Sequence, residues 1–138
     1  MSITHLLDTS VYSQPLKKKP LPHVIHRWEQ LGDNSCCISI FCEAELLQGL
    51  EMKNSQNLWQ AYRAILENRL PIISFELKSA KSFAVLQATN IKQGKPKPVM
   101  DMIIAATAMA HNLILATCNY KDFKDIPGLQ VEDWIQEI

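Results

Sequence analysis

The 138-residue sequence predicts an α/β fold, in which a parallel β-sheet lies between two layers of α-helices in a Rossmann-like three-layer arrangement. Segments typical of strands alternate with segments typical of helices along the whole chain. The strand segments are continuously apolar, which indicates strands that are buried on both faces. The length, together with 47% hydrophobic and 20% charged residues, suits one folded domain, which we expect to span residues 1–138.

The first half of the chain contains two predicted strands and three predicted helices. These are, in order, a strand over 3–7, a helix from Pro22 to Leu31, a strand over 36–41, a helix that carries Glu43 and Glu45, and a helix capped by Ser55. Proline suits the first turn of a helix, and Gly32 is expected to end the first one. Apolar residues at helical spacing predict the inner face of the last helix, which consists of Leu58, Tyr62, Ile65 and Leu66.

The second half continues the alternation. Its predicted elements are a strand over 70–75, a helix over 77–93, a helix over 102–110 that Asp101 opens, a strand over 113–117 and a short strand near 130–131. Gly94 is expected to end the long helix, whose close-packing positions are predicted at Ala80, Ala84 and Ile91. The segment 102–120 carries no formal charge, but a histidine and an asparagine at its centre favour a buried helix, a turn and a strand over a membrane span.

The balance of charge limits how this chain could bind nucleic acid. Lys and Arg number 14 and Asp and Glu number 14, so no overall basic field attracts a polyanion and any RNA contact must use a local patch. A run of lysines can form such a patch, but it is also typical of a solvated loop. The candidates for such a patch are Lys17, Lys18, Lys19, Lys95 and Lys97.

The cysteines and the N-terminus indicate the compartment. The four cysteines form no C-x-x-C pair, and Cys36 and Cys37 are adjacent, which disfavours a disulfide between them. Buried, reduced thiols and a cytoplasmic protein are therefore expected. The apolar stretch at the start is interrupted by Asp8, so no signal peptide is expected.

Polar and acidic residues stand at or near the predicted carboxyl ends of strands. In open parallel sheets, binding sites form beyond these ends. Clustered carboxylates repel one another unless a hard cation such as Mg²⁺ or Mn²⁺ neutralises them, and such ions support phosphodiester hydrolysis. Taken singly, acidic and amide residues at such positions also suit an Asx-turn, a surface charge, a helix cap or a left-handed turn. The candidate site residues are Asp8, Glu45, Asp101, Asn119 and Asp122.

Four segments make the sequence similar to a known family. They are LLDTSVY from Leu6, AELLQGL from Ala44, DMIIAATAMAHNLILATCNYKDF from Asp101 and PGLQVEDW from Pro127. In this order, and over nearly the whole chain, they resemble the PIN-domain ribonucleases, specifically the VapC-type toxins of bacterial toxin–antitoxin pairs. The segment from Asp101 is the most specific of the four.

The resemblance implies an Mg²⁺- or Mn²⁺-dependent endoribonuclease that forms a homodimer and is held inactive by a cognate VapB-type antitoxin. It implies that Asp8, Asp101 and Glu45 bind the metal, and that Asn119 or Asp122 completes the site. Hydrogen bonds that support the site are implied for Thr9, Ser10 and Thr117. Cys118 departs from the family, in which a basic residue is common at this position.

We expect a water to attack the RNA phosphate in line, with Glu45 binding metal or orienting and deprotonating that water, and products with 5′-phosphate and 3′-hydroxyl ends. An antitoxin would silence the site by inserting an Arg or Lys among the carboxylates.

The alternative to a ribonuclease is a catalytically silent PIN-like module that binds RNA or protein. Phosphatases that use a strand-end aspartate need a second acid where Ser10 stands, so this reading is set aside.

Overall fold

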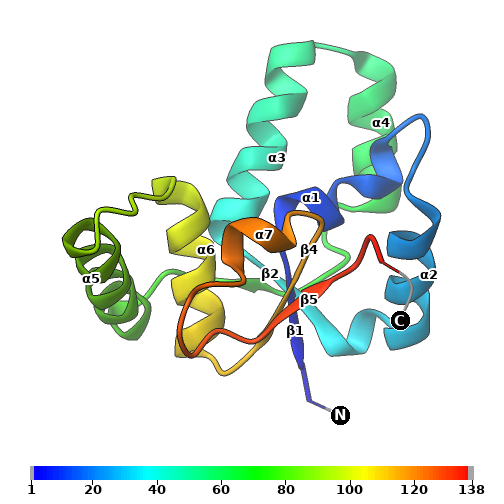
Figure 1. Ribbon diagram of the computed structural model, residues 1–138. Helices are drawn as coiled ribbons and strands as arrows, with labels where there is room; N and C mark the ends of the chain where they lie inside the picture. The colour runs from blue at the N-terminus through cyan, green and yellow to red at the C-terminus, as the bar shows by residue number, and fades with distance from the viewer. Residues whose placement is uncertain (1, 137–138) are drawn as a thin grey trace.

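The computed structural model describes residues 2–136, which form a five-stranded sheet with helices on both faces (Figure 1). The elements are, in chain order, β1 (His5–Leu7), α1 (Thr9–Tyr12), the 3₁₀ helix η1 (Gln14–Leu16), α2 (Pro22–Leu31), the 3₁₀ helix η2 (Asp33–Ser35), β2 (Cys36–Ser39), α3 (Ile40–Lys53), α4 (Gln56–Ile65), β3 (Ile72–Ile73), α5 (Leu77–Lys92), α6 (Val99–Ala110), β4 (Ile114–Thr117), α7 (Tyr120–Phe123) and β5 (Val131–Asp133).

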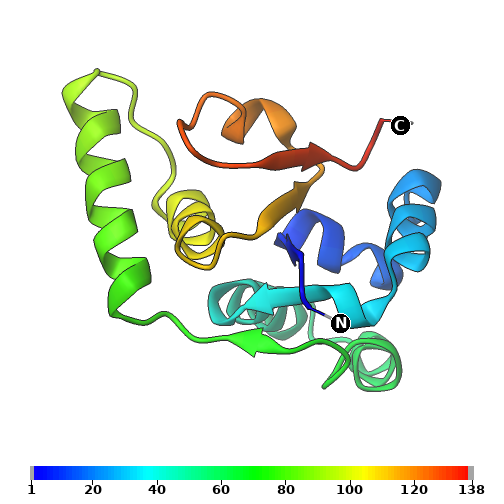
Figure 2. The ribbon, with the colours of Figure 1, turned by 90° about the horizontal axis from the view of Figure 1, so that it is seen from below.

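The sheet has the strand order β3-β2-β1-β4-β5, and all neighbouring strands are parallel. The predicted parallel α/β fold is therefore confirmed. From β1 the chain extends the sheet to β2 and β3 on one side and to β4 and β5 on the other, so the order reverses between β1 and β4 (Figure 2). A crevice opens beyond the carboxyl ends of the strands at such a reversal, which places the expected site after β1 and β4.

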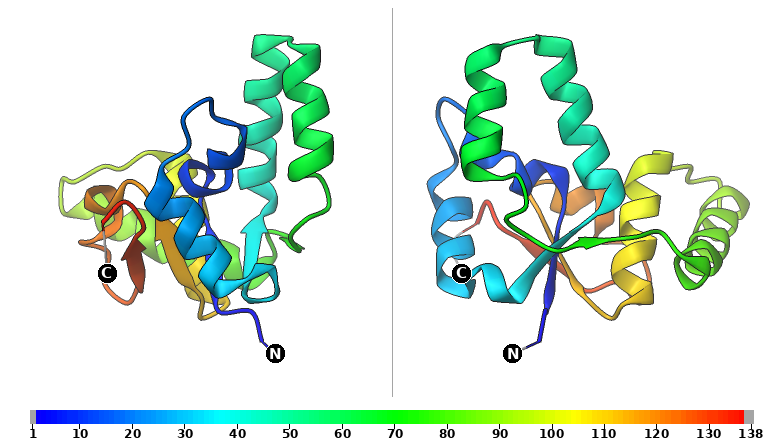
Figure 3. Two further views of the ribbon diagram at one scale, coloured as in Figure 1. Left: turned by 90° about the vertical axis from the view of Figure 1, so that its right-hand side faces the viewer. Right: turned by 180° about the vertical axis from the view of Figure 1, so that it is seen from behind.

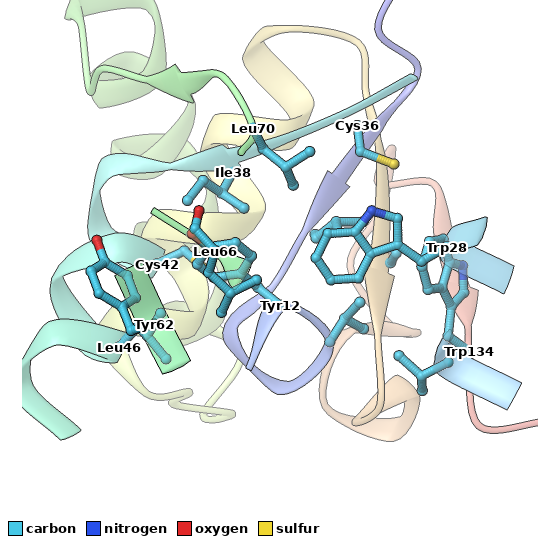
Figure 4. Close-up of a cluster of buried hydrophobic side chains, with 14 of the residues drawn as sticks. Tyr12, Trp28, Cys36, Ile38, Cys42, Leu46, Tyr62, Leu66, Leu70 and Trp134 are labelled. Atoms are coloured by element: carbon cyan, nitrogen blue, oxygen red, sulfur yellow. The ribbon is translucent and has the colours of Figure 1, made fainter. Parts of the chain in front are cut away.

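The two faces of the sheet bury two separate apolar cores. Leu7, Ile38 and Ala116 face the core beneath α1 to α4, which also contains Trp28 and Trp134 (Figure 4). On the opposite face, the core beneath α5 and α6 is built from alternate strand residues and helix residues, among them Leu6, Cys37, Leu115, Met102 and Ala105. Successive strand residues point to opposite faces, so strands covered on both sides are apolar throughout.

Helices α3 and α4 form a pair that projects beyond the carboxyl edge of the sheet (Figure 3). The boundary between β2 and α3 explains why the predicted strand over 36–41 was too long. Ser39 Oγ accepts the N–H of Cys42 and caps α3, so Ile40 and Phe41 belong to the helix. The third strand is also shorter than the predicted 70–75, with two residues.

Several other details differ from the prediction. Helix α1 was not predicted; the Asp8 side chain caps it by accepting the N–H of Val11. Helix α6 begins two residues before Asp101, which therefore lies in its first turn and does not cap it. Three predicted packing positions face solvent, because their helices turn other residues inward: Ile65 is 40% exposed, Ile91 is 65% exposed, and Ala84 is also exposed.

Other predicted boundaries are confirmed. Pro22 lies in the first turn of α2, and Gly32 ends it with φ +81°, a conformation that glycine adopts without strain. Ser55 caps α4 by accepting the N–H of Leu58. The uncharged segment 102–120 contains most of α6, a turn at Asn112 and β4. Within residues 2–136, the helices are too short or too polar to cross a bilayer.

Candidate active site

Asp8 is the most buried acidic side chain of the predicted site. It follows β1 directly and is 5% exposed. Its carboxylate accepts hydrogen bonds from the hydroxyls of Ser10 and Thr117 and from the main-chain N–H of Val11. Burial raises the pKa of Asp8, and these hydrogen bonds act in the opposite direction.

The two hydroxyls also connect Asp8 to the chain that leaves β4. Ser10 Oγ accepts the N–H of Cys118 at 3.0 Å, and Thr117 Oγ1 accepts the N–H of Asn119 at 2.9 Å. Each hydroxyl therefore donates a hydrogen bond to the carboxylate and accepts one from the backbone, so both its donor and its acceptor capacity are used. This arrangement fixes the Asp8 side chain at the reversal between β1 and β4.

Glu45 belongs to the second turn of α3 and is held by α1. Thr9 Oγ1 donates to Glu45 Oε1 at 2.6 Å, so Thr9 supports Glu45 and not Asp8. Asp101 lies near both Glu45 and Asp122. Its pKa is raised by burial and then by the negative charges of Asp122 and Glu45, while Lys97 acts to lower it. Asp101 is thus within electrostatic reach of both other carboxylates.

The two candidates for the fourth position lie in and before α7. Both Asn119 and Asp122 are exposed. Asn119 has φ −117°, which excludes the left-handed turn that its residue type also suited. Lys97 Nζ donates to the main-chain oxygen of Asp122 at 3.1 Å, so one predicted lysine lies beside the acidic residues.

A groove of about 680 Å³ is lined by residues of α3, α4 and the chain around and after α1, and Glu45 is among its lining residues. Two predicted lysines, Lys17 and Lys18, line it, whereas Lys19 and Lys95 are exposed and outside its lining. The sequence analysis missed Lys53, which also lines the groove. Its spacing from Glu45, at i and i+8, was a usable signal because residues four apart share a helix face. The apolar lining consists of Leu16, Leu46, Leu50, Leu58 and Ala61.

The donor atoms at this edge suit a hard cation, since carboxylates are the ligands that Mg²⁺ and Mn²⁺ prefer. The side chains do not form a ready-made cage. Among the described residues, no three His, Cys, Asp or Glu side chains are close enough together to hold a metal ion. Mg²⁺ needs no such cage, because it is usually bound through one or two carboxylates, with water and phosphate oxygens as the other ligands. The residues present therefore fit a divalent cation.

Comparison with known proteins places the chain in a family. The PIN domain model matches residues 5–129. Ribonuclease VapC2 of Haemophilus influenzae is 30% identical over 133 residues, which cover 96% of this chain and 99% of the relative. The chain is a PIN-domain protein of the VapC ribonuclease family. A second relative is tRNA(fMet)-specific endonuclease VapC of Salmonella typhimurium. It is 30% identical over 134 residues, and the match covers 94% of this chain and 96% of the relative.

Solved structures of VapBC complexes share this PIN fold. The DNA-bound VapBC structure from Salmonella typhimurium matches with a TM-score of 0.82 and 27% identity, covering 96% of this chain and 98% of that chain. VapBC-1 from nontypeable Haemophilus influenzae matches with a TM-score of 0.79 and 31% identity, covering 99% and 100%. A further structure, FitAcB from Neisseria gonorrhoeae, matches with a TM-score of 0.85 and 25% identity, covering 96% of this chain and 100% of that chain. The predicted family and fold class are both confirmed.

Proposed function

We propose that this protein is the toxin of a toxin–antitoxin pair and an endoribonuclease that hydrolyses RNA phosphodiester bonds with Mg²⁺ or Mn²⁺. The observation that carries the proposal is the acidic edge at the reversal between β1 and β4, formed by Asp8, Glu45, Asp101 and Asp122. There two hydroxyls hold Asp8, and burial, then Asp122 and Glu45, raise the pKa of Asp101. The relatives named ribonuclease VapC support it. We further propose that residues 1–138 form one domain and act in the cytoplasm.

In this proposal Asp8 and Asp101 bind the cation, with Glu45 as a third ligand or as the base that orients and deprotonates the attacking water. A bound divalent cation lowers the pKa of water and neutralises charge on the phosphate. The hydroxyls of Ser10 and Thr117 hold the Asp8 carboxylate, and Thr9 holds Glu45. Asn119 and Asp122 remain alternatives for the fourth position. The expected products carry 5′-phosphate and 3′-hydroxyl ends.

Lysines on two sides of the acidic edge are the proposed RNA contacts. Lys97 contacts the main chain of α7, and Lys17, Lys18 and Lys53 line the groove that Glu45 also lines. Phosphate contacts release counterions, so replacing Lys17 and Lys18 by Ala should reduce the dependence of RNA affinity on salt. An unchanged salt slope would remove them from the RNA surface. Transfer RNA is the first substrate to test, because one relative is named a tRNA(fMet)-specific endonuclease.

The same groove supports the proposal of a VapB-type antitoxin as partner. Its leucines offer an apolar surface for a peptide segment, and Glu45 is one of its lining residues. An Arg or Lys of the antitoxin that reached Glu45, Asp8 and Asp101 would compete with the cation. The similarity to VapBC complexes supports this partner. If apolar contacts anchor the antitoxin, the pair should co-purify at high salt, whereas release by salt would contradict them.

The proposed homodimer is supported by a stripe of apolar side chains on the outer face of α5. Leu77 and Ile91 are 69% and 65% exposed, and Ala84 and Ala88 lie on the same face between them. Stripes of this kind mark interaction surfaces. Sedimentation of the wild type and of a Leu77→Glu, Ile91→Glu variant should show a dimer and a monomer respectively.

The proposed function is tested by RNA cleavage with Mn²⁺, after any bound antitoxin has been removed. Cleavage should disappear in EDTA and in the variant Asp8→Asn, because an amide caps α1 as well as a carboxylate does but binds metal poorly. The matched control is Asp125→Asn, an exposed aspartate outside the site, which should cleave normally. Protein that binds RNA and cuts none of it would favour the alternative, a catalytically silent PIN-like binding module.

A further inference from the structure

Glu43 is a buried acidic side chain that the proposed chemistry does not use. It lies two residues before Glu45 on α3 and is 7% exposed. The Tyr62 hydroxyl donates to its Oε1 at 2.7 Å, and the Tyr12 hydroxyl lies 3.2 Å from its Oε2 and 3.2 Å from the main-chain oxygen of Leu66. Within residues 2–136, no Lys, Arg or His forms an ion pair with Glu43.

This arrangement costs free energy that an apolar cluster would not. Tyr12, Tyr62 and Leu66 belong to the core beneath α1 to α4 (Figure 4), and a carboxyl group loses its hydration there. Burial and the charge of Glu43 both raise the pKa values of Tyr12 and Tyr62. Buried polar clusters can often be replaced by apolar residues of similar volume without loss of stability. Stability alone is therefore a poor explanation for the cluster.

The three side chains come from the elements that build the acidic edge. Tyr12 ends α1, which begins with Thr9 directly after Asp8; Glu43 precedes Glu45 by two residues on α3. Tyr62 belongs to α4, whose residues line the groove beside Glu45. Two side-chain hydrogen bonds thus join α1 to α3, one from Tyr12 to Glu43 and one from Thr9 to Glu45. Because hydrogen bonds are directional, they fix a position that apolar contacts leave free to shift.

We propose that Glu43 is a positioning residue, which acts through Tyr12 and is itself oriented by Tyr62, and that it sets Glu45 relative to Asp8. This inference rests on the proposed function, because the geometry that it sets is that of the metal-binding carboxylates. A displacement of about 1 Å at a reacting group reduces the rate by up to about 100-fold. Loss of the cluster should therefore lower kcat and the affinity for Mn²⁺. The KM for RNA should change little, since the proposed RNA contacts are lysines elsewhere.

The test separates positioning from stability by comparing two variants. The triple variant Tyr12→Phe, Glu43→Leu, Tyr62→Phe removes every polar group of the cluster, so it leaves no buried hydroxyl or carboxyl group there without a partner. The variant Glu43→Gln keeps the cluster: its amide oxygen accepts from Tyr62, and its NH₂ donates to Tyr12, whose hydroxyl then donates to Leu66. Glu51→Gln, at an exposed position on the same helix, is the control.

Melting temperature, Mn²⁺ affinity measured by electron paramagnetic resonance, and steady-state cleavage kinetics are compared. We expect the triple variant to melt near the wild-type temperature, with about 10-fold weaker Mn²⁺ binding, about 10-fold lower kcat and an unchanged KM. Glu43→Gln and Glu51→Gln should match the wild type. A folded triple variant with wild-type Mn²⁺ affinity and kcat would overturn the inference.

If the triple variant does not fold, Tyr12→Phe decides, because it removes one hydroxyl, which takes away the contacts with Glu43 and with the Leu66 main-chain oxygen and leaves the Thr9–Glu45 hydrogen bond in place. Weaker Mn²⁺ binding would support the positioning role, and unchanged binding would overturn it. Failure of the proposed function has a different signature: the wild type itself would neither bind Mn²⁺ nor cleave RNA, and the inference would fall with it.

Discussion

Acidic side chains have opposite surroundings in two regions of this protein. Beside α2, Glu132 Oε1 lies 3.0 Å from His5 Nε2 and 3.2 Å from the Arg27 guanidinium, and Asp33 is 3.0 Å from Arg69 Nε. Around the carboxyl ends of β1 and β4, Asp8 and Glu45 accept hydrogen bonds from hydroxyls, and Asp101 lies within electrostatic reach of Asp122 and Glu45. The ion pairs found within residues 2–136 do not include Asp8, Glu45 or Asp101.

The pKa values reflect this contrast. Burial acts to raise the pKa of Glu132, but the hydrogen bond from Trp134 and the contacts with His5 and Arg27 outweigh it, so the pKa lies below its usual value. Burial raises the pKa of Asp101, and two neighbouring carboxylates add to the effect. One region uses acidic groups in ion pairs that stabilise the fold, and the other holds carboxylates whose pKa values are raised, which is typical of functional sites.

The largest expected effect comes from Asp101→Asn. It removes a proposed metal ligand, so RNA cleavage in Mn²⁺ should fall by at least about 100-fold. Removal of a repelled carboxylate should leave the free energy of unfolding equal to or above that of the wild type. Cleavage assays and urea unfolding, both on the same preparation, check the two parts. A variant that loses activity only because it unfolds would contradict the contrast between the regions.

Glu132→Gln should show the reverse behaviour. His5, Arg27 and Trp134 all contact Glu132 Oε1, and the carboxylate is about a quarter exposed. Loss of its charge should lower the free energy of unfolding by about 1–2 kcal/mol, a range that allows for partial solvent screening. Cleavage at 25 °C should be unchanged, since the residue lies outside the acidic edge. Urea unfolding measures the first effect. If the variant unfolded at the same urea concentration as the wild type, the ion pairs of Glu132 would not stabilise the fold.

Metal binding sharpens the same comparison. Mn²⁺ at ten times its dissociation constant should add about 1.4 kcal/mol to the free energy of unfolding of the wild type. Glu132→Gln should gain as much, and Asp101→Asn should gain little at the same Mn²⁺ concentration. Thermal unfolding with Mn²⁺ and with EDTA provides the measurement. Equal gains in all three proteins would place the metal somewhere other than the acidic edge.

The smallest expected effect is a difference in pH dependence without metal. The pKa of Asp101 is raised above its usual 3.8, so the folded state binds more protons and stability falls as pH rises through the window above that value. The pKa of Glu132 is lowered below its usual 4.5, so its contribution is present above 4.5 and is lost as pH falls. In EDTA, Asp101→Asn should therefore gain on the wild type as pH rises toward 7, whereas Glu132→Gln should approach it toward pH 3. If the curves of stability against pH for both variants ran parallel to that of the wild type, neither carboxyl would change its pKa on folding.

Much of the site was predictable because its residues carry local signals. Asp8 directly follows a predicted apolar strand, and the family resemblance implied supporting hydrogen bonds from Thr9, Ser10 and Thr117. The partner of Thr9 was not predictable, because Glu45 lies 36 residues further along the chain. The same limit applies to Glu43, whose tyrosine partners are 31 and 19 residues away. Helix α1 escaped prediction because four residues are too few to show a helical period.

The sequence by itself determined the alternation of buried strands and helices, the family and the types of residue at the carboxyl ends of the strands. Continuous apolar runs, caps and turn residues encode these features locally. Only the tertiary structure decided which acids pair with a base, which accept from a hydroxyl and which feel the charge of another acid. The physical reason is that the charge state of a carboxyl depends on neighbours within a few ångströms, and packing of the sheet brings those neighbours from distant parts of the chain.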